Sequence, residues 1–262
     1  MTQRDNWGWK ARFGMFIVSS EAVPEAEWWA MAPEGISVHA ARVTASAPWV
    51  AWDAERRRVT LADDLKRGAE QFAAMRLSAV VLGHSSSSLV GGAGWDEAVI
   101  ERLSEILGPE ISVSTNGLDC LAALGASGVT RPFLVFPPWF NDATLEKGLA
   151  WFGAHGVTRA GHMRHDPGPG WREVPFAEMY PEGLGFEQQI EPLYAAIRTA
   201  CPAEADGVLI LGTGFRCVGI IDALERDLAR PAITANQASL WQCLRLAGIR
   251  PEIDGYGSLF AR

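Results

Sequence analysis

The feature that most constrains this chain is the alternation of short apolar runs with amphipathic stretches. The apolar runs are nearly continuous, which is typical of parallel strands that are covered on both faces. The runs are FGMFIVSS (13–20), ISVHAARV (36–43), SAVVLGHS (78–85), ISVSTN (111–116), PFLVFPP (132–138), GVLILGTG (207–214) and AITAN (232–236). Stretches with helical spacing that end near glycine are 96–108, 116–128, 142–156 and 217–229. This alternation predicts an α/β fold with mainly parallel sheets.

A weak internal repeat predicts two similar halves. The segments that begin with AVVLGHSS (79–86) and GVLILGTG (207–214) each continue through a helix and a short strand to a CL-containing helix. We therefore predict two pseudo-symmetric, doubly wound lobes, the first made of residues 1–115 and 235–262 and the second of residues 116–234. Ligands of open α/β sheets bind beyond the carboxyl ends of the strands. We expect the site in the cleft between the lobes, where the two glycine-rich turns face each other.

Charge and hydropathy narrow the classes of partner. The net charge is −8 and there is no basic stripe, which argues against nucleic acid. No run approaches the roughly 18 to 20 apolar residues of a membrane span, and the polar N-terminus lacks the apolar core of a secretion signal. We expect a cytoplasmic protein whose partner is a small-molecule substrate, with no nucleic acid and no membrane. A homodimer or higher homo-oligomer is compatible with the sequence.

The sequence predicts neither a metal site nor a cofactor. The four cysteines are scattered without the spacing of metal ligands or of a disulfide framework: Cys120, Cys201, Cys217 and Cys243. His162 and His165 have the spacing of metal ligands in GHMRHDPGPG. The prolines and glycines around them, and the absence of a carboxylate pattern, favour a solvated loop.

Several blocks, in this order, resemble one enzyme family. They are FGMFIVSSEAVPEAEWW (13–29), PEGISVHAARV (33–43), GHSSSSLVGG (83–92), PEISVSTNGLDCLAALGASGV (109–129), PFLVFPPW (132–139) and RPAITANQASLWQCLRLAGI (230–249). Together they resemble the aspartate/glutamate racemase superfamily, in the branch of maleate cis–trans isomerases and arylmalonate decarboxylases. The resemblance implies cofactor-independent chemistry on a small carboxylate, with one thiol at each of two strand ends.

The chain departs from this family at the residues that matter most. The two thiol positions correspond to His84 and Gly212, and none of the four cysteines matches either. A tyrosine that the family often carries corresponds to Trp139, and an asparagine that holds a substrate carboxylate corresponds to Glu21. A thiolate route is therefore not expected. Glu21 in a pocket would repel an anionic arm of a substrate.

The groups that could stabilise an anion are still present. Hydroxyl and backbone N–H groups at the predicted helix starts favour an oxyanion or a carboxylate. His84 has an ordinary pKa near 6.5, which suits proton transfer at neutral pH. The candidate catalytic residues are His84, Ser85, Ser86 and Glu21. The candidate substrate-binding residues are Ser19, Ser20, Trp139, Gly212, Thr213, Gly214 and Arg216.

Three hypotheses about function remain open. The first is a lyase that resembles the decarboxylases and forms an enolate beside an oxyanion hole, with His84 as acid or base. The second is another enzyme: a cis–trans isomerase or racemase without cysteine, or a hydrolase that opens an amide-like substrate with water activated by His84 and Glu21. The third is a binding protein that retains the fold without catalysis. The missing thiols favour the third hypothesis, whereas His84 beside a cluster of hydroxyls favours the first two.

Overall fold

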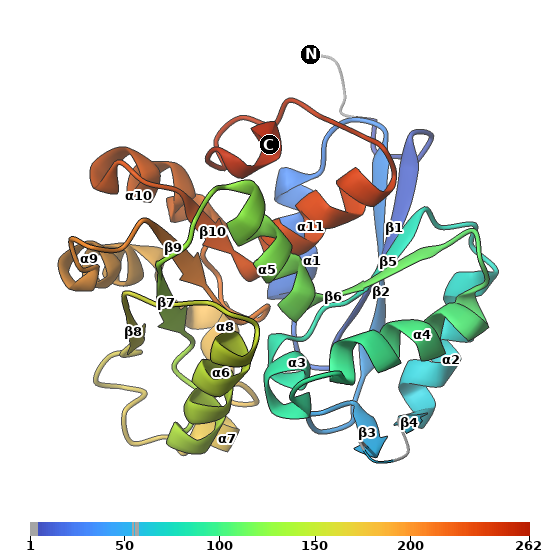
Figure 1. Ribbon diagram of the computed structural model, residues 1–262, viewed down its shortest axis with the longest axis horizontal. Helices are drawn as coiled ribbons and strands as arrows, with labels where there is room; N and C mark the ends of the chain where they lie inside the picture. The colour runs from blue at the N-terminus through green and yellow to red at the C-terminus, as the bar shows by residue number, and fades with distance from the viewer. Residues whose placement is uncertain (1–4, 54, 56–57) are drawn as a thin grey trace.

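A computed structural model describes residues 5–53, 55 and 58–262, and its strands form two separate four-stranded sheets (Figure 1). The first sheet has the order β2-β1-β5-β6, and all its neighbouring strands are parallel. Its strands are β1 (Ala11–Val18), β2 (Ile36–Val43), β5 (Ala79–Leu82) and β6 (Ser112–Thr115). Every residue of β5 is buried, as expected for an apolar strand with neighbours on both sides.

The second sheet is also parallel throughout, with the order β10-β9-β7-β8. Its strands are β7 (Pro132–Phe136), β8 (Gly161–Arg164), β9 (Gly207–Ile210) and β10 (Ala232–Thr234). The two central strands, β7 and β9, are buried along their whole length. The parallel α/β architecture predicted from the apolar runs is therefore confirmed, whereas the predicted lobe boundaries stay a prediction.

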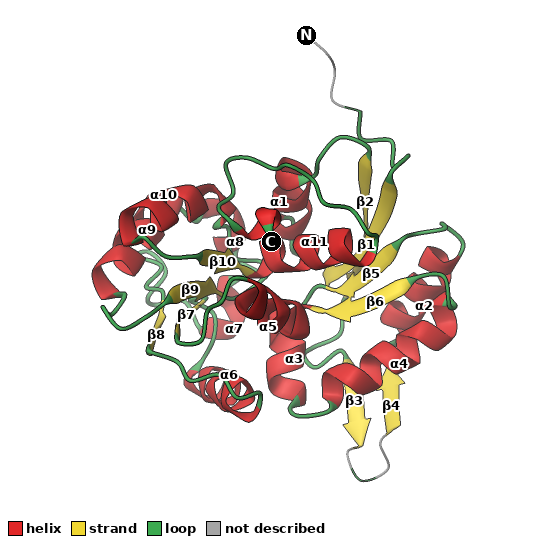
Figure 2. Ribbon diagram, turned by 45° about the horizontal axis from the view of Figure 1, so that its top comes forward, coloured by secondary structure: helices red, strands yellow, loops and turns green. Residues whose placement is uncertain are grey.

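Helices cover the sheets and fill the space between them. The first half of the chain has α1 (Val23–Met31), α2 (Asp63–Ala73), α3 (Ser85–Gly91), α4 (Trp95–Leu107) and α5 (Asn116–Ala126). The second half has α6 (Asp142–Ala154), α7 (Phe176–Met179), α8 (Leu184–Glu187), α9 (Ile190–Ala200), α10 (Ile221–Leu228), α11 (Ala235–Leu246) and the short 3₁₀ helices η1 (Val218–Ile220) and η2 (Leu259–Ala261). Helices α5 and α11 pack against each other in the middle of the molecule, between the two groups of strands (Figure 2).

The structure adds strands that the sequence did not indicate. β3 (Val50–Asp53) and β4 (Arg58–Leu61) form an antiparallel hairpin beyond the first sheet. The segment around His162, which we expected to be a solvated loop, instead forms the edge strand β8. Its short sequence does not predict a strand, and pairing with β7 provides the backbone hydrogen bonds that stabilise it. No helix in the described part of the chain is long and apolar enough to cross a membrane.

Candidate active site at the strand ends

The carboxyl ends of the two sheets are joined by a hydrogen bond between the two glycine-rich turns. The Gly212 N–H, just after β9, donates to Ser85 Oγ at 3.2 Å, and the Ser85 hydroxyl donates to Asn116 Oδ1 at 2.6 Å. Asn116 in turn donates to the carbonyl oxygen of Ala235 at 2.9 Å. Residues more than a hundred positions apart are thus held together where β5, β6, β9 and β10 end.

Most of the serine run has a structural task. The Ser88 hydroxyl donates to Asp96 Oδ1 at 2.6 Å, and Ser87 Oγ accepts the backbone N–H of Trp49 at 3.2 Å. The hydroxyl of Ser85 is equally committed between the two turns. Ser86 differs, because it is half-buried and its side chain has no hydrogen-bond partner among the described residues. Of the two candidate catalytic serines, Ser85 and Ser86, Ser86 is the one whose hydroxyl is left for a ligand.

His84 is fixed from two sides. Its ring stacks on Trp49, with ring centroids 4.2 Å apart and an interplanar angle of 17°. Its Nδ1 lies 2.8 Å from Ser87 Oγ. Burial lowers the pKa of His84 to about 3, so the imidazole is neutral at physiological pH. The sequence had suggested a group that titrates near pH 6.5, and the tertiary environment changes that expectation.

The hydrogen bonds select one tautomer of His84. Ser87 Oγ accepts the Trp49 N–H, and the only described acceptor for its own hydroxyl proton is His84 Nδ1. The ring proton is therefore assigned to Nε2. Nε2 has no protein partner among the described residues. His84 consequently offers a neutral N–H donor to a ligand rather than an imidazolium.

Glu21 follows β1 and its carboxyl group is buried. Glu21 has 5% of its surface exposed, and Oε2 has no hydrogen-bond partner. Burial raises the pKa of this carboxyl to about 8, opposed by the nearby Thr213 hydroxyl and by the charge of Arg42. Thr213 lies beside the carboxyl without completing a hydrogen bond with it, since its Oγ1 also lacks a partner. At neutral pH Glu21 is a protonated acid, so it does not repel an anionic substrate as the sequence had suggested.

The absence of a side chain at Gly214 leaves room for the Glu21 carboxyl and the Tyr180 hydroxyl on the same side of the backbone. A Cβ atom at this position would lie 2.6 Å from Glu21 Oε1 and 2.7 Å from the hydroxyl oxygen of Tyr180. The Tyr180 hydroxyl is buried and has no hydrogen-bond partner. Burial, followed by the neighbouring Glu21, raises the pKa of Tyr180, so it retains its proton. Three protonated groups, those of Glu21, Thr213 and Tyr180, are gathered around one glycine.

Aromatic rings form a wall beside this cluster. Trp139, just after β7, meets Tyr180 edge-on with ring centroids 5.0 Å apart. Its ring also contacts Phe215 edge-on at 5.7 Å. His165, just after β8, also packs against Phe215, with ring centroids 5.6 Å apart. The indole predicted to line a pocket is thus placed next to the cluster.

The turn that carries Thr213 is held by a second buried carboxyl group. Glu27 Oε1 accepts the N–H groups of Cys217 at 2.6 Å and Val218 at 3.0 Å. The Asn236 side chain donates to Glu27 Oε2 at 2.7 Å and to the Thr213 carbonyl oxygen at 2.8 Å. α1 and α11 therefore fix the turn from both sides, which positions the Thr213 hydroxyl.

Three predicted residues lie away from this cluster. Ser19 and Ser20 are exposed on the turn after β1, and the Ser19 carbonyl oxygen accepts from Arg42 at 3.2 Å. Arg216 is exposed and lines a different pocket, together with residues of α1. The structure does not bring their side chains to Glu21, and their roles remain predictions.

Four residues that shape the site were not predicted from the sequence. Tyr180 comes from the short helices between β8 and α9, which carry no family-like block. Trp49 and Ser87 fix His84, and only the position of Ser87 in the serine run hinted at this. The buried carboxyl of Glu27 could have been suspected from its place among the apolar residues of AVPEAEWWA (22–30).

Three of the four cysteines lie in the interior. Cys120, Cys217 and Cys243 are buried, and burial raises the pKa of each thiol. Thiolates are therefore disfavoured at these three positions. Within the described ranges, no group of three or more histidine, cysteine, aspartate or glutamate side chains could hold a metal ion.

Comparisons with known proteins match part of the sequence and the fold of this chain to one group of enzymes. Residues 187–260 match the family model of arylmalonate decarboxylase. A comparison with curated proteins finds no match. Among solved structures, a cysteine-to-alanine variant of the maleate isomerase Iso from Pseudomonas putida S16 with maleate is 17% identical with a TM-score of 0.75, over 96% of this chain and 97% of that chain.

Two further structures are similar over nearly their whole length. The maleate cis–trans isomerase of Nocardia farcinica bound to TRIS is 20% identical with a TM-score of 0.76, over 95% of this chain and 97% of that chain. A crystal structure of arylmalonate decarboxylase is 20% identical with a TM-score of 0.69, over 95% and 99%. The chain therefore has the fold that arylmalonate decarboxylase and the maleate isomerases share. Together with the match of residues 187–260, this fold confirms the predicted resemblance to that branch of the aspartate/glutamate racemase superfamily.

Proposed function

We propose that the protein is a cofactor-independent lyase that decarboxylates a small dicarboxylate or a related carbonyl compound. The observation that carries this proposal is the buried, protonated Glu21 carboxyl, gathered with two unpartnered hydroxyl groups around Gly214. A carboxylic acid kept neutral by its surroundings can donate a hydrogen bond or a proton at pH 7. The structural likeness to arylmalonate decarboxylase supports the same class of reaction.

The proposed chemistry needs one electron pair and one proton. The bond between the α-carbon and a departing carboxylate breaks, CO₂ leaves, and the electron pair moves into the remaining carboxylate to form an enediolate. Protonated Glu21 then gives its proton to the α-carbon and is reprotonated from water. The proton transfer assigned to His84 from the sequence thus moves to Glu21, because a neutral imidazole with a pKa of about 3 is a weak base and carries no acidic second proton.

Developing negative charge is placed near neutral donors. We assign this role to the Tyr180 and Thr213 hydroxyls, to His84 Nε2–H and to the Ser86 hydroxyl. Preorganised donors in a water-excluded site stabilise an oxyanion most effectively, since they need little reorganisation during the reaction. The packing of His84 against Trp49 and of Tyr180 against Trp139 supplies that rigidity.

The alternatives use the same residues less well. A hydrolase in which Glu21 activates water requires an ionised carboxylate, which burial disfavours at neutral pH. An isomerase or racemase without cysteine needs a base as well as an acid beside the substrate, and His84 is a weak base because burial lowers its pKa to about 3. A binding protein without catalysis would retain the donors and show affinity without turnover.

The test is decarboxylation of phenylmalonate, followed by ¹H NMR of the monoacid product. We expect turnover to be highest at neutral pH, to fall to half near pH 8 and to decline further above it, because Glu21 loses its proton with a pKa of about 8. Glu21→Gln should abolish the proton-transfer step while retaining the shape of the site. His84→Gln should lower kcat by about 10²-fold through lost oxyanion stabilisation, with the pH dependence unchanged.

Controls separate the site from general effects. Glu146→Gln, on the exposed face of α6, makes the same substitution at a surface carboxylate and should leave both kcat and the pH profile unchanged. Phenylmalonate that binds without turnover would favour the binding protein. Full activity in Glu21→Gln would contradict the assignment of the proton donor.

A further inference from the structure

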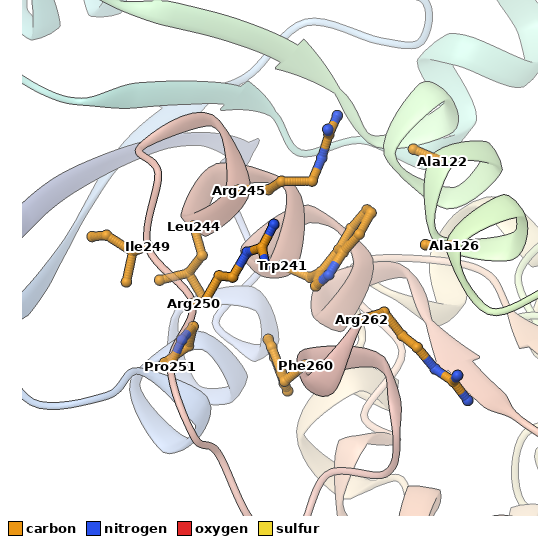
Figure 3. Close-up of a pocket in the computed structure, with 10 residues that line it drawn as sticks. All are labelled: Ala122, Ala126, Trp241, Leu244, Arg245, Ile249, Arg250, Pro251, Phe260 and Arg262. Carbon is orange, nitrogen blue, oxygen red and sulfur yellow. The ribbon is translucent and has the colours of Figure 1, made fainter.

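A pocket lies between the C-terminal halves of α5 and α11, away from the strand ends (Figure 3). Its volume is about 360 Å³, within the range of small-molecule sites. Helix α5 contributes Ala122 and Ala126, whereas its first residue, Asn116, belongs to the candidate active site. Ten residues of helix separate Asn116 from Ala126, or about 15 Å. The pocket is therefore distinct from the candidate active site.

Three arginines surround this pocket. Figure 3 shows Arg245 and Arg250 on one side of Trp241 and Arg262 on the other. None of them forms an ion pair with a carboxylate in the described part of the chain, although the protein has a net charge of −8. Arg250 and Arg262 have no side-chain hydrogen bond there either, and Arg245 bonds only to Gln242, at 3.0 Å. Positive charge is thus concentrated on one pocket of an acidic protein without an ion pair to a carboxylate of the described residues. The charge of Arg245 acts at longer range on buried Asp119, where it partly offsets the rise in pKa that burial causes.

The floor between the arginines is apolar. Trp241, Leu244 and Phe260 are buried, with 6%, 1% and 5% of their surfaces exposed, and they form the base of the pocket. The Arg245 guanidinium lies over the Trp241 ring at 5.6 Å, which leaves its planar edge for a second partner. Guanidinium groups bind carboxylate and phosphate oxygens in a bidentate manner. The arginine side chains and the apolar floor of the pocket together suit a ligand with an anionic group attached to an apolar body.

We propose that this pocket binds a small organic anion, a carboxylate or phosphate ester with a ring or short aliphatic body. The anionic group is held by Arg245 and Arg250, and the apolar body lies on Trp241 and Phe260. This site is independent of the reaction proposed above, because it shares no side chain with the cluster around Gly214. Its ligand is a second molecule rather than the substrate.

The test uses benzoate and inorganic phosphate as probes in isothermal titration calorimetry. We expect benzoate to bind with a stoichiometry of one, and phosphate, which has no apolar body, at least tenfold more weakly. Arg250→Gln and Arg245→Gln should each raise the Kd of benzoate at least tenfold. Ala126→Trp, which fills the pocket and retains all three arginines, should abolish binding. These positions are exposed, so the variants are expected to fold.

Matched variants separate binding at this pocket from overall charge, from the candidate active site and from self-association. Arg159→Gln removes an exposed arginine elsewhere and should change the Kd less than twofold. Glu21→Gln should also leave it unchanged. Equal weakening in Arg159→Gln would reduce the effect to overall charge, and loss of binding only in Glu21→Gln would place benzoate in the candidate active site. A dimer that dissociates in Arg250→Gln, with no benzoate binding, would assign the pocket to a second copy of the chain. Each of these three results overturns the proposal.

Discussion

Replacement of Glu21 by glutamine should make the folded protein less sensitive to alkaline pH. The folded state holds the Glu21 proton up to pH about 8, whereas the unfolded chain releases it near 4.5. Between these values the folded state binds more protons, so its stability falls as the pH rises. From pH 5 to pH 8 this difference costs the wild type about 3 kcal/mol of unfolding free energy, at 1.36 kcal/mol per unit of pKa difference.

Urea denaturation of wild type and Glu21→Gln at pH 5, 6, 7 and 8 measures this effect directly. The glutamine retains the shape of the side chain and cannot ionise, so its unfolding free energy should gain about 3 kcal/mol relative to wild type across this range. Glu146→Gln, exposed on α6, should show no such gain. Parallel curves for wild type and Glu21→Gln would refute the buried, protonated carboxyl and the proposed role as proton donor.

Three further predictions concern a glycine, a serine and the cysteines. Gly214→Ala places a methyl group within 2.7 Å of two side chains and should lower kcat/KM at least tenfold, whereas Gly153→Ala, which meets no atom within 4 Å, should leave kcat/KM unchanged. Ser85→Ala leaves the buried Gly212 N–H without its acceptor and should lower the unfolding free energy by about 1–3 kcal/mol in urea, while an unchanged midpoint would contradict this structural link. Iodoacetamide should label Cys201 first, because it alone of the four cysteines is not fully buried, and the labelled protein should retain its turnover. Mass spectrometry measures the labelling, and a loss of activity in proportion to it would support a thiol mechanism.

The sequence by itself determined the apolar strands and their parallel arrangement, and it predicts a site at their carboxyl ends. Apolar runs such as 79–82 and 207–210 mark buried strands, because the pattern depends only on neighbouring residues and on which faces are covered. The same runs end in GHSSSS and GTG, and the rule that ligands bind at the carboxyl ends of strands follows from topology. The edge strand β8 and the hairpin of β3 and β4 were not predicted, because short strands are stabilised chiefly by the strands with which they pair.

Only the tertiary structure decided the hydrogen-bond partners and the protonation states of the side chains at the candidate site. Ser85 reads as an oxyanion donor in the sequence, yet its hydroxyl is committed to Gly212 and Asn116, which are 127 and 31 residues away. His84 and Glu21 exchange their expected ionisation behaviour, because burial disfavours the charged form of both and leaves the histidine neutral and the carboxyl protonated. Tyr180 joins them from a segment without any local signal. Burial sets the pKa values of these groups, and contacts between distant residues set their hydrogen-bond partners. The periodicity of a single stretch of sequence predicts neither the pKa values nor the partners.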